Sequence, residues 1–179
     1  MYDPLTTRRA LFSWLVAALV FAFICLTPSV AHAAFGLTST TDFYTIDTGS
    51  TPGLVFKIRR TNNGSNTQSP GDIASLVYNG IEYQDQSRGS QVNSGVDYIY
   101  SNTAVVSVDA LLVGADFIKV TVVSGDPAVS GILTHYYMAR RGDPFIYMAT
   151  HFTSEPTGQA LCRYILRMQV GNLTNGPTP

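Results

Sequence analysis

Hydrophobic and polar positions alternate in short runs along most of the chain after residue 35, and this period of two is that of a half-buried β-strand. No window in this region holds an apolar stripe of helical spacing longer than about three turns. The runs are rich in valine, isoleucine and tyrosine, which favour strands. We therefore expect about nine strands. They are placed at residues 43–47, 54–59, 73–78, 96–100, 104–112, 116–123, 131–139, 144–153 and 160–170.

Turn residues separate these runs. Asn79-Gly80 is a strong signal for a two-residue hairpin turn, and residues 81–83 are expected to form the returning strand of that hairpin. Polar loops rich in Asn, Ser and Gly are expected at 61–71 and 85–95. Many short strands joined by such turns predict an all-β fold, an antiparallel β-sandwich or barrel.

The first 33 residues depart from this pattern. Arg8-Arg9 is followed by an apolar run at 10–26, and a helix-breaking Thr-Pro-Ser sequence precedes an Ala-His-Ala site at 31–33. These parts, in this order, are those of a secretory signal peptide that is removed after residue 33. A retained membrane anchor is the alternative, but the run is slightly short for a span of about 20 residues. We expect a secreted protein, extracellular or, in a bacterium, periplasmic.

Charge and cysteine content exclude several classes. Removing Asp3, Arg8 and Arg9 with the signal leaves nine basic and eleven acidic side chains, a net charge of −2. Such a domain gives no reason to expect nucleic acid or, after cleavage, a membrane as its partner. Cys162 is the one cysteine that remains, so no internal disulfide is expected. No ligand spacing for a metal and no cofactor motif is present, so we expect neither.

Residues able to do acid–base chemistry are present without a catalytic pattern. No Gly-x-Ser-x-Gly elbow supports a Ser-His-Asp triad. A glycosidase-type carboxylate pair stays open, although Glu82 and Glu155 are the only glutamates. His135 and His151 each stand alone on an alternating run, and we expect both to be surface or half-buried strand residues.

The last expected strand carries the most informative pattern. In the sequence RYILRM at 163–168, a period of two places Arg163, Ile165 and Arg167 on one face. Two guanidinium groups about 13 Å apart along a sheet face suit an acidic ligand, because arginine binds carboxylates bidentately. A solvated, charged outer face is the alternative. Tyrosines on neighbouring strands could stack on sugars or pack in the core.

Seven segments form an ordered series along the chain: AFGLT at 34–38, GDIASLVYNGIEYQ at 71–84, RGSQVNSG at 88–95, ADFIKVT at 115–121, RGDPFIYMAT at 141–150, SEP at 154–156 and RYILR at 163–167. In this order they resemble the N-terminal part of rhamnogalacturonan lyases of polysaccharide lyase family 4. The likeness extends from Phe35 to about residue 170, and it rests on the ordered set rather than on any one segment.

The resemblance implies a secreted, pectin-degrading enzyme that cleaves the rhamnose–galacturonate backbone of rhamnogalacturonan I by β-elimination. It also implies that residues 34–179 are the N-terminal part of a galactose-mutarotase-like β-super-sandwich, incomplete at its C-terminal end. An arginine, in place of a catalytic metal, is the expected partner of the substrate carboxylate. This catalytic and substrate-binding role carries onto Arg163, with Arg167 as a second substrate-binding residue.

The resemblance also implies that the catalytic base is missing. The family's lysine base and its partner histidine lie beyond Pro179, and we do not expect other lysines or histidines of this chain to replace them. The expected partner is an acidic plant cell-wall polysaccharide, and the expected state is a monomer. Two further hypotheses stay open, a non-catalytic carbohydrate-binding β-sandwich for acidic glycans and a secreted structural β-domain without a sugar site.

Overall fold

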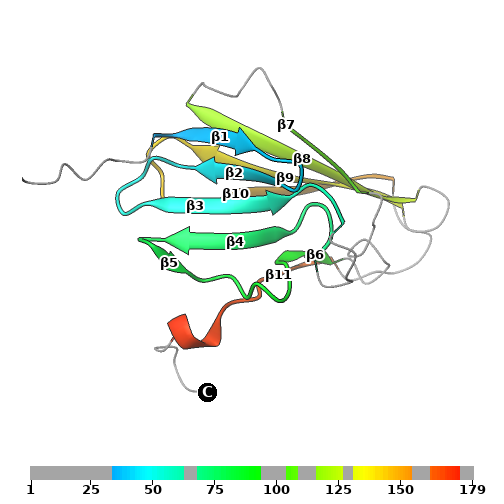
Figure 1. Ribbon diagram of the computed structural model, residues 1–179. Coiled ribbons are helices and arrows are strands. Elements are labelled where there is room, and N and C mark those ends of the chain that lie inside the picture. The colour runs from blue at the N-terminus through cyan, green and yellow to red at the C-terminus, as the bar shows by residue number, and fades with distance from the viewer. Residues whose placement is uncertain are drawn as a thin grey trace, which may run out of the picture. The chain divides into compact units, whose positions relative to one another are not determined.

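The computed structural model describes residues 34–62, 68–93, 104–108, 116–126, 131–154 and 162–173 (Figure 1). All of them belong to the second of the two compact units into which the chain divides, His32–Pro179. Over these residues the chain forms eleven strands and one short 3-10 helix, η1 (Val170–Asn172). None of the helical structure in this part is long and apolar enough to cross a membrane. The all-β prediction is confirmed, and the expected signal peptide lies outside the described residues.

The first sheet contains five antiparallel strands that pair in sequence order. They are β1 (Gly36–Ser39), β2 (Phe43–Asp47), β3 (Leu54–Arg59), β4 (Ile73–Tyr78) and β5 (Ile81–Glu82). Alternation is clearest in β3, where Leu54, Phe56 and Ile58 are buried and Lys57 is exposed. Asn79 and Gly80 join β4 to β5 with φ angles of 50° and 78°, the left-handed conformation that a tight hairpin turn requires.

The second sheet contains four antiparallel strands in the order β10-β9-β8-β7. They are β7 (Val105–Val108), β8 (Phe117–Asp126), β9 (Gly131–Arg140) and β10 (Tyr147–Ser154). β8 and β9 pair along their whole length, from Phe117 opposite Arg140 to Asp126 opposite Gly131. β10 lies at the edge of this sheet, and most of its residues are exposed whichever face they occupy.

A third, two-stranded sheet pairs β6 (Gln91–Asn93) with β11 (Arg163–Ile165) in antiparallel register. It is tied to the first sheet because Ser90 forms a bridge with Ile73 of β4. The Ile73 N–H donates to the Ser90 carbonyl at 2.8 Å, and the Ser90 N–H donates back at 3.0 Å. A strand from the end of the sequence is thereby held beside residues 70 positions earlier.

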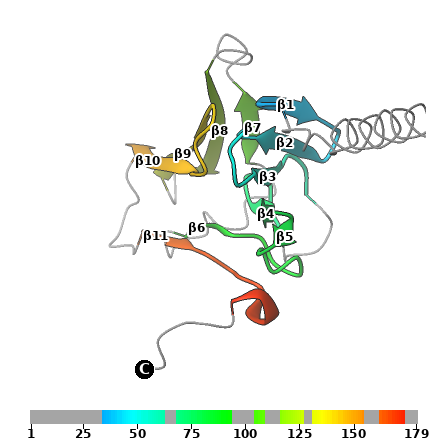
Figure 2. The same ribbon diagram turned by 90° about the vertical axis from the view of Figure 1, so that its left-hand side faces the viewer.

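The two larger sheets enclose one hydrophobic core (Figure 2). Its buried members are Ile46, Phe56, Ile58 and Ile73 from the first sheet and Ile118, Val120, Val122, Tyr137 and Ala139 from the second. Full burial of each large apolar side chain contributes about 1.5–3 kcal/mol, so this shared core is the main stabilising contact between the sheets. The sequence left open a sandwich or a barrel, and the structure is a sandwich.

The expected bounds are confirmed for strands in which apolar and polar residues alternate clearly, and the bounds of several other strands differ from those expected. β2, β3 and β4 have the expected bounds. β1 and β6 were not expected, because they lie in polar segments and are defined by their pairing partners rather than by an apolar pattern. β8 continues to Asp126, so it is longer than the expected strand at 116–123. The expected strand at 96–100 lies outside the described residues.

Candidate functional site

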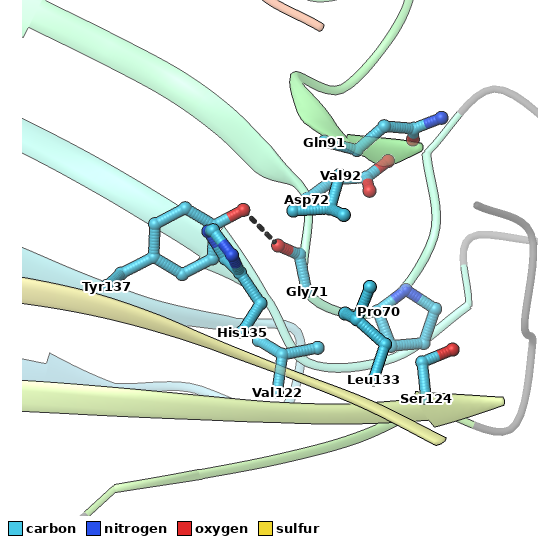
Figure 3. A pocket seen from close by; sticks show the side chains of 10 residues that line it. All are labelled: Pro70, Gly71, Asp72, Gln91, Val92, Val122, Ser124, Leu133, His135 and Tyr137. Atoms are coloured by element: carbon cyan, nitrogen blue, oxygen red, sulfur yellow. Dashed lines mark hydrogen bonds between the residues drawn. The ribbon is translucent and has the colours of Figure 1, made fainter. Parts of the chain in front are cut away.

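A small cavity lies between the two larger sheets, next to β6 (Figure 3). Its volume is about 30 Å³, close to the volume that one water molecule occupies in the liquid. Its lining residues are Pro70, Gly71, Asp72, Gln91, Val92, Val122, Ser124, Leu133, His135 and Tyr137. A sugar ring cannot enter this volume, so the cavity is a buried polar cluster and does not itself hold a polysaccharide.

Asp72 is the charged member of this cluster and is only 2% exposed. Its Oδ2 accepts the Ser69 N–H at 2.8 Å. With its amide nitrogen turned toward Asp72, Gln91 donates to both carboxylate oxygens at 2.9 Å. Burial raises the pKa of Asp72 to about 7, although the Ser69 N–H and the positive charges of Arg167 and Arg59 oppose the rise.

Two glycines allow the backbone to approach this cluster. A Cβ on Gly89 would lie 2.3 Å from Oδ2 of Asp72, well inside contact distance. Gly71 has a φ of 92°, and a Cβ there would lie 2.4 Å from Cγ1 of Val122. A side chain at either position would displace the loop that carries Asp72. This steric limit explains why glycine occupies both positions.

His135 corrects an expectation, because it is buried, with 3% exposure, rather than at the surface or half-buried. Its Nδ1 contacts Oγ1 of Thr150 at 2.9 Å, and its Nε2 is buried and has no hydrogen-bond partner in the part of the chain that the structure describes. Burial lowers the pKa of His135 to about 4, so the ring is neutral at physiological pH. Alternation indicated which face of β9 it occupies but not that Tyr164 of β11 covers that face. His151 is exposed, as expected.

Two tyrosine hydroxyl groups join the cluster to β11. Tyr137 donates to the Gly71 carbonyl at 2.9 Å and lies 3.3 Å from the Tyr164 hydroxyl. The Tyr164 ring stacks on His135 with ring centres 5.6 Å apart, and its hydroxyl lies 3.4 Å from the Ser90 carbonyl. Burial raises the pKa of both tyrosines, so both stay protonated and can donate.

Arg163 lies next to this anchor in sequence and on the other face of β11. Tyr164 packs against the hydrophobic core. Since successive side chains of a strand point to opposite faces, Arg163 points away from the core. Its side chain is exposed and forms no hydrogen bond or ion pair with the described residues. The guanidinium group of Arg163 is therefore exposed on a strand whose opposite face is fixed to the core through Tyr164.

Arg167 lies in a different environment from Arg163. β11 ends at Ile165, so the expected strand at 160–170 is shorter in the described part, and a shared strand face for the two arginines does not form. The Arg167 N–H donates instead to Oγ of Ser90 at 2.8 Å, and its guanidinium group donates to the Gly89 carbonyl.

The described residues do not gather a metal site, since no group of three or more His, Cys, Asp and Glu side chains occurs among them. Cys162 is exposed at the start of β11, and partial burial raises its pKa. The residues that support β11 (Asp72, His135, Tyr137 and Tyr164) were not identified as a cluster from the sequence. They come from positions 72 to 164, and only folding brings them together.

Fold and site define an antiparallel β-sandwich that presents to solvent an arginine with no side-chain partner among the described residues. Residues 35–179 match the family model described as rhamnogalacturonan lyase B, N-terminal. The chain therefore belongs to this family of rhamnogalacturonan lyase N-terminal domains, which confirms the resemblance seen in the sequence.

Similar proteins come from filamentous fungi. The chain is 40% identical over 158 residues to a probable rhamnogalacturonate lyase A of Aspergillus terreus, covering 88% of this chain and 25% of that protein. It is 35% identical over 161 residues to rhamnogalacturonate lyase A of Aspergillus aculeatus, covering 90% and 26%. The chain thus spans about a quarter of the length of these relatives.

Proposed function

We propose that this chain is the substrate-binding N-terminal region of a secreted rhamnogalacturonan endolyase, and that Arg163 binds the carboxylate of a galacturonate residue. The observation that carries the proposal is the exposed guanidinium group of Arg163, which has no partner among the described residues and lies on a strand anchored through Tyr164. Family membership supports the choice of rhamnogalacturonan as the acidic polysaccharide.

The role of an arginine follows from the chemistry of β-elimination. The proton on C5 of a uronate is weakly acidic, because its removal adds negative charge beside an ionised carboxylate. A guanidinium group paired with that carboxylate stabilises the developing charge. A base then takes the C5 proton, a double bond forms between C4 and C5, and the glycosidic oxygen leaves from C4.

We further propose that the base is not supplied by the described part of this chain. His135 has the wrong properties, because its ring is buried between tyrosines. Lys57 lies on the outer face of the first sheet and Lys119 on β8, neither on β6 or β11. We expect the chain by itself to bind rhamnogalacturonan without cleaving it.

Arg167 has a supporting role in this proposal. Its guanidinium group is directed to the Gly89 carbonyl and its charge acts on Asp72, so its first effect is to fix the β6–β11 region. Its contribution to substrate binding is therefore smaller than that of Arg163.

A chimera tests the lyase function. Residues 35–179 replace the matching region of rhamnogalacturonate lyase A of Aspergillus aculeatus, and products are followed by the ultraviolet absorbance of the unsaturated uronate. We expect turnover, and we expect Arg163→Gln to reduce kcat by about 10²-fold or more, because a charge-stabilising donor is lost. Arg140→Gln, an exposed arginine on β9, is the matched control and leaves turnover unchanged.

The alternative is a non-catalytic carbohydrate-binding sandwich, which the separation of Arg163 from any base in the described residues favours. It predicts that the chain binds rhamnogalacturonan, that Arg163→Gln weakens binding, and that the chimera shows no turnover. A folded chimera whose activity is insensitive to Arg163→Gln contradicts the catalytic role of this arginine in either case.

A further inference from the structure

The outer face of the first sheet, turned away from the core, carries a second pocket. Its volume is about 240 Å³, and its lining residues are Phe43, Lys57, Arg59, Gln68, Ala74, Ser75 and Gln86. The strand register builds it, because Phe43 lies opposite Arg59 and Lys57 lies opposite Ser75 on the same face. None of these residues comes from β6 or β11, so the pocket is distinct from the Arg163 site.

Arg59 is oriented before any ligand arrives. Its Nε donates to Oε1 of Gln68 at 3.0 Å, and its guanidinium carbon lies 4.6 Å from the centre of the Phe43 ring. Gln68 is itself fixed, being 6% exposed and donating to the Gln86 carbonyl at 2.6 Å. The two terminal nitrogens of Arg59 have no hydrogen-bond partner among the described residues. A planar fork whose two ends are not engaged by the described residues matches a carboxylate.

Lys57 adds a second positive charge on the same side. It lies two positions before Arg59 on β3, roughly 7 Å along the strand. Its ammonium group lies 5.9 Å from the centre of the same Phe43 ring. The side chain is exposed and forms no ion pair with the described residues. Two cations beside one aromatic ring favour an anion that also carries apolar C–H groups.

Glu82 is the carboxylate linked to this pocket, and it does not neutralise Arg59. Its oxygens accept hydrogen bonds from the Ser75 hydroxyl at 2.5 Å, the Leu76 N–H at 2.7 Å, the Gln84 N–H at 2.9 Å and the Gln86 amide at 2.9 Å. Burial raises the pKa of Glu82, but these hydrogen bonds outweigh burial and the pKa lies below its ordinary value. Its hydrogen-bonding capacity is therefore used within the fold.

We propose that this pocket is a second glycan-binding site, which holds one uronate residue of an acidic polysaccharide through Arg59 and Lys57. The volume lies below the roughly 300–1,000 Å³ of pockets for drug-sized ligands, which suits one sugar residue rather than an oligosaccharide. The choice of a uronate rests on the proposed function, whereas a site for a carboxylate follows from the geometry of Arg59 alone. A site on this face would hold the polymer away from the reacting bond.

The test is a titration of the purified, isotope-labelled chain with trigalacturonate, followed by amide shifts in NMR spectra. We expect shifts in Lys57, Arg59 and Gln68, and an affinity that falls as salt rises, because exposed charges are screened. Arg59→Gln is expected to weaken binding by about tenfold, as loss of a charged hydrogen-bonding pair does. Arg59→Lys keeps the charge but loses the fork of two terminal nitrogens. We therefore expect the affinity of this variant to lie between those of the native chain and the Arg59→Gln variant.

Two controls make the result decisive. Lys119→Gln matches Lys57→Gln, because Lys119 also lies over an aromatic ring, 5.7 Å from the centre of Tyr136, but on the second sheet. We expect Lys119→Gln to leave the affinity for trigalacturonate unchanged and Lys57→Gln to lower it. The Lys57→Gln variant tests the site even if the Arg59→Gln variant does not fold. Neutral galactotriose does not shift these amides.

Arg163→Gln separates this site from the proposed lyase function, because it leaves the shifts at Lys57 and Arg59 intact. Equal affinity of the native chain and the folded Arg59 and Lys57 variants, or equal shifts with galactotriose, overturns the second site whatever the chimera shows.

Discussion

At the scale of single residues, Asp72 shows how strongly the fold changes the environment of a carboxyl group. The unfolded chain holds this carboxyl at a pKa near 3.8, and the folded chain at about 7. The folded protein therefore binds the proton more tightly than the unfolded chain does. The stability that this group contributes is fully present below about pH 3.8 and is lost as the pH rises through about 7. Arg59, Arg167 and the donors around the carboxylate limit this loss.

Asp72→Asn tests this linkage. The free energy of unfolding of the native protein, measured by urea denaturation, is expected to fall between pH 4 and pH 7 by up to a few kcal/mol more than that of the variant. At pH 8 the variant is expected to be the more stable protein, because it buries no charge. Parallel pH profiles for the two proteins would falsify the raised pKa of Asp72.

Gly89 tests the packing around the same carboxylate. Gly89→Ala places a methyl group 2.3 Å from Oδ2 of Asp72, and we expect it to cost about 2 kcal/mol or more, as overpacking does. Gly171→Ala is the control, because nothing lies within 4 Å of a Cβ there. It should change the free energy of unfolding by less than about 0.5 kcal/mol. Equal effects of the two substitutions on the thermal midpoint contradict the close contact.

At the scale of elements, β11 shows how a strand can depend on distant residues. It has three residues and pairs with a strand of three, and an isolated pair of that size is not stable in water. Its position is set by Tyr164, which packs on His135 and Tyr137, and by Arg167 on the Gly89 carbonyl. Arg163 is held in an exposed position because Tyr164 and Arg167 fix the strand on both sides of Ile165.

Tyr164→Phe tests this anchor while leaving the ring in place. The variant loses the hydroxyl contacts to Tyr137 and to the Ser90 carbonyl, and we expect a cost of about 1 kcal/mol. Hydrogen exchange of the β11 amides should become faster than in the native protein. Tyr147→Phe is the control, because its hydroxyl contacts Asp143 at the exposed start of β10. Unchanged exchange in β11 would show that ring packing alone holds the strand.

At the scale of the whole molecule, stability comes from one core shared by two sheets. Residues 34–179 hold a single cysteine, Cys162, so they form no disulfide among themselves. Binding, as proposed, uses two separate surfaces, Arg163 on β11 and the Arg59 pocket on the outer face of the first sheet. The family match places this sandwich in the N-terminal region of rhamnogalacturonan lyases.

The export expected from the sequence concerns the whole chain and can be measured directly. We expect a secreting host to release a protein whose N-terminal sequence begins at Ala34, as read by mass spectrometry, because the site at 31–33 fits signal cleavage. Ala33→Arg should block processing and leave the precursor in the membrane fraction. Release of a protein that still begins at Met1 contradicts the signal-peptide assignment.

The sequence by itself determined the fold class, most of the long strands, the family and the residue expected to bind the substrate. Period-two alternation is a local property, so strands such as β3 and β4 could be placed to the residue. The ordered motifs were also local, and they led to the family that the comparisons confirm.

Only the tertiary structure decided which polar residues are buried and which arginine is free. β6 and β11 exist because they pair with each other and because Ser90 bridges to Ile73. The burial of Asp72 and His135, and the different environments of Arg163 and Arg167, depend on contacts between residues far apart in the sequence, such as that of Arg167 with Gly89, 78 positions earlier. Such contacts leave no periodic trace in the sequence, because they form only when the two sheets close over their common core.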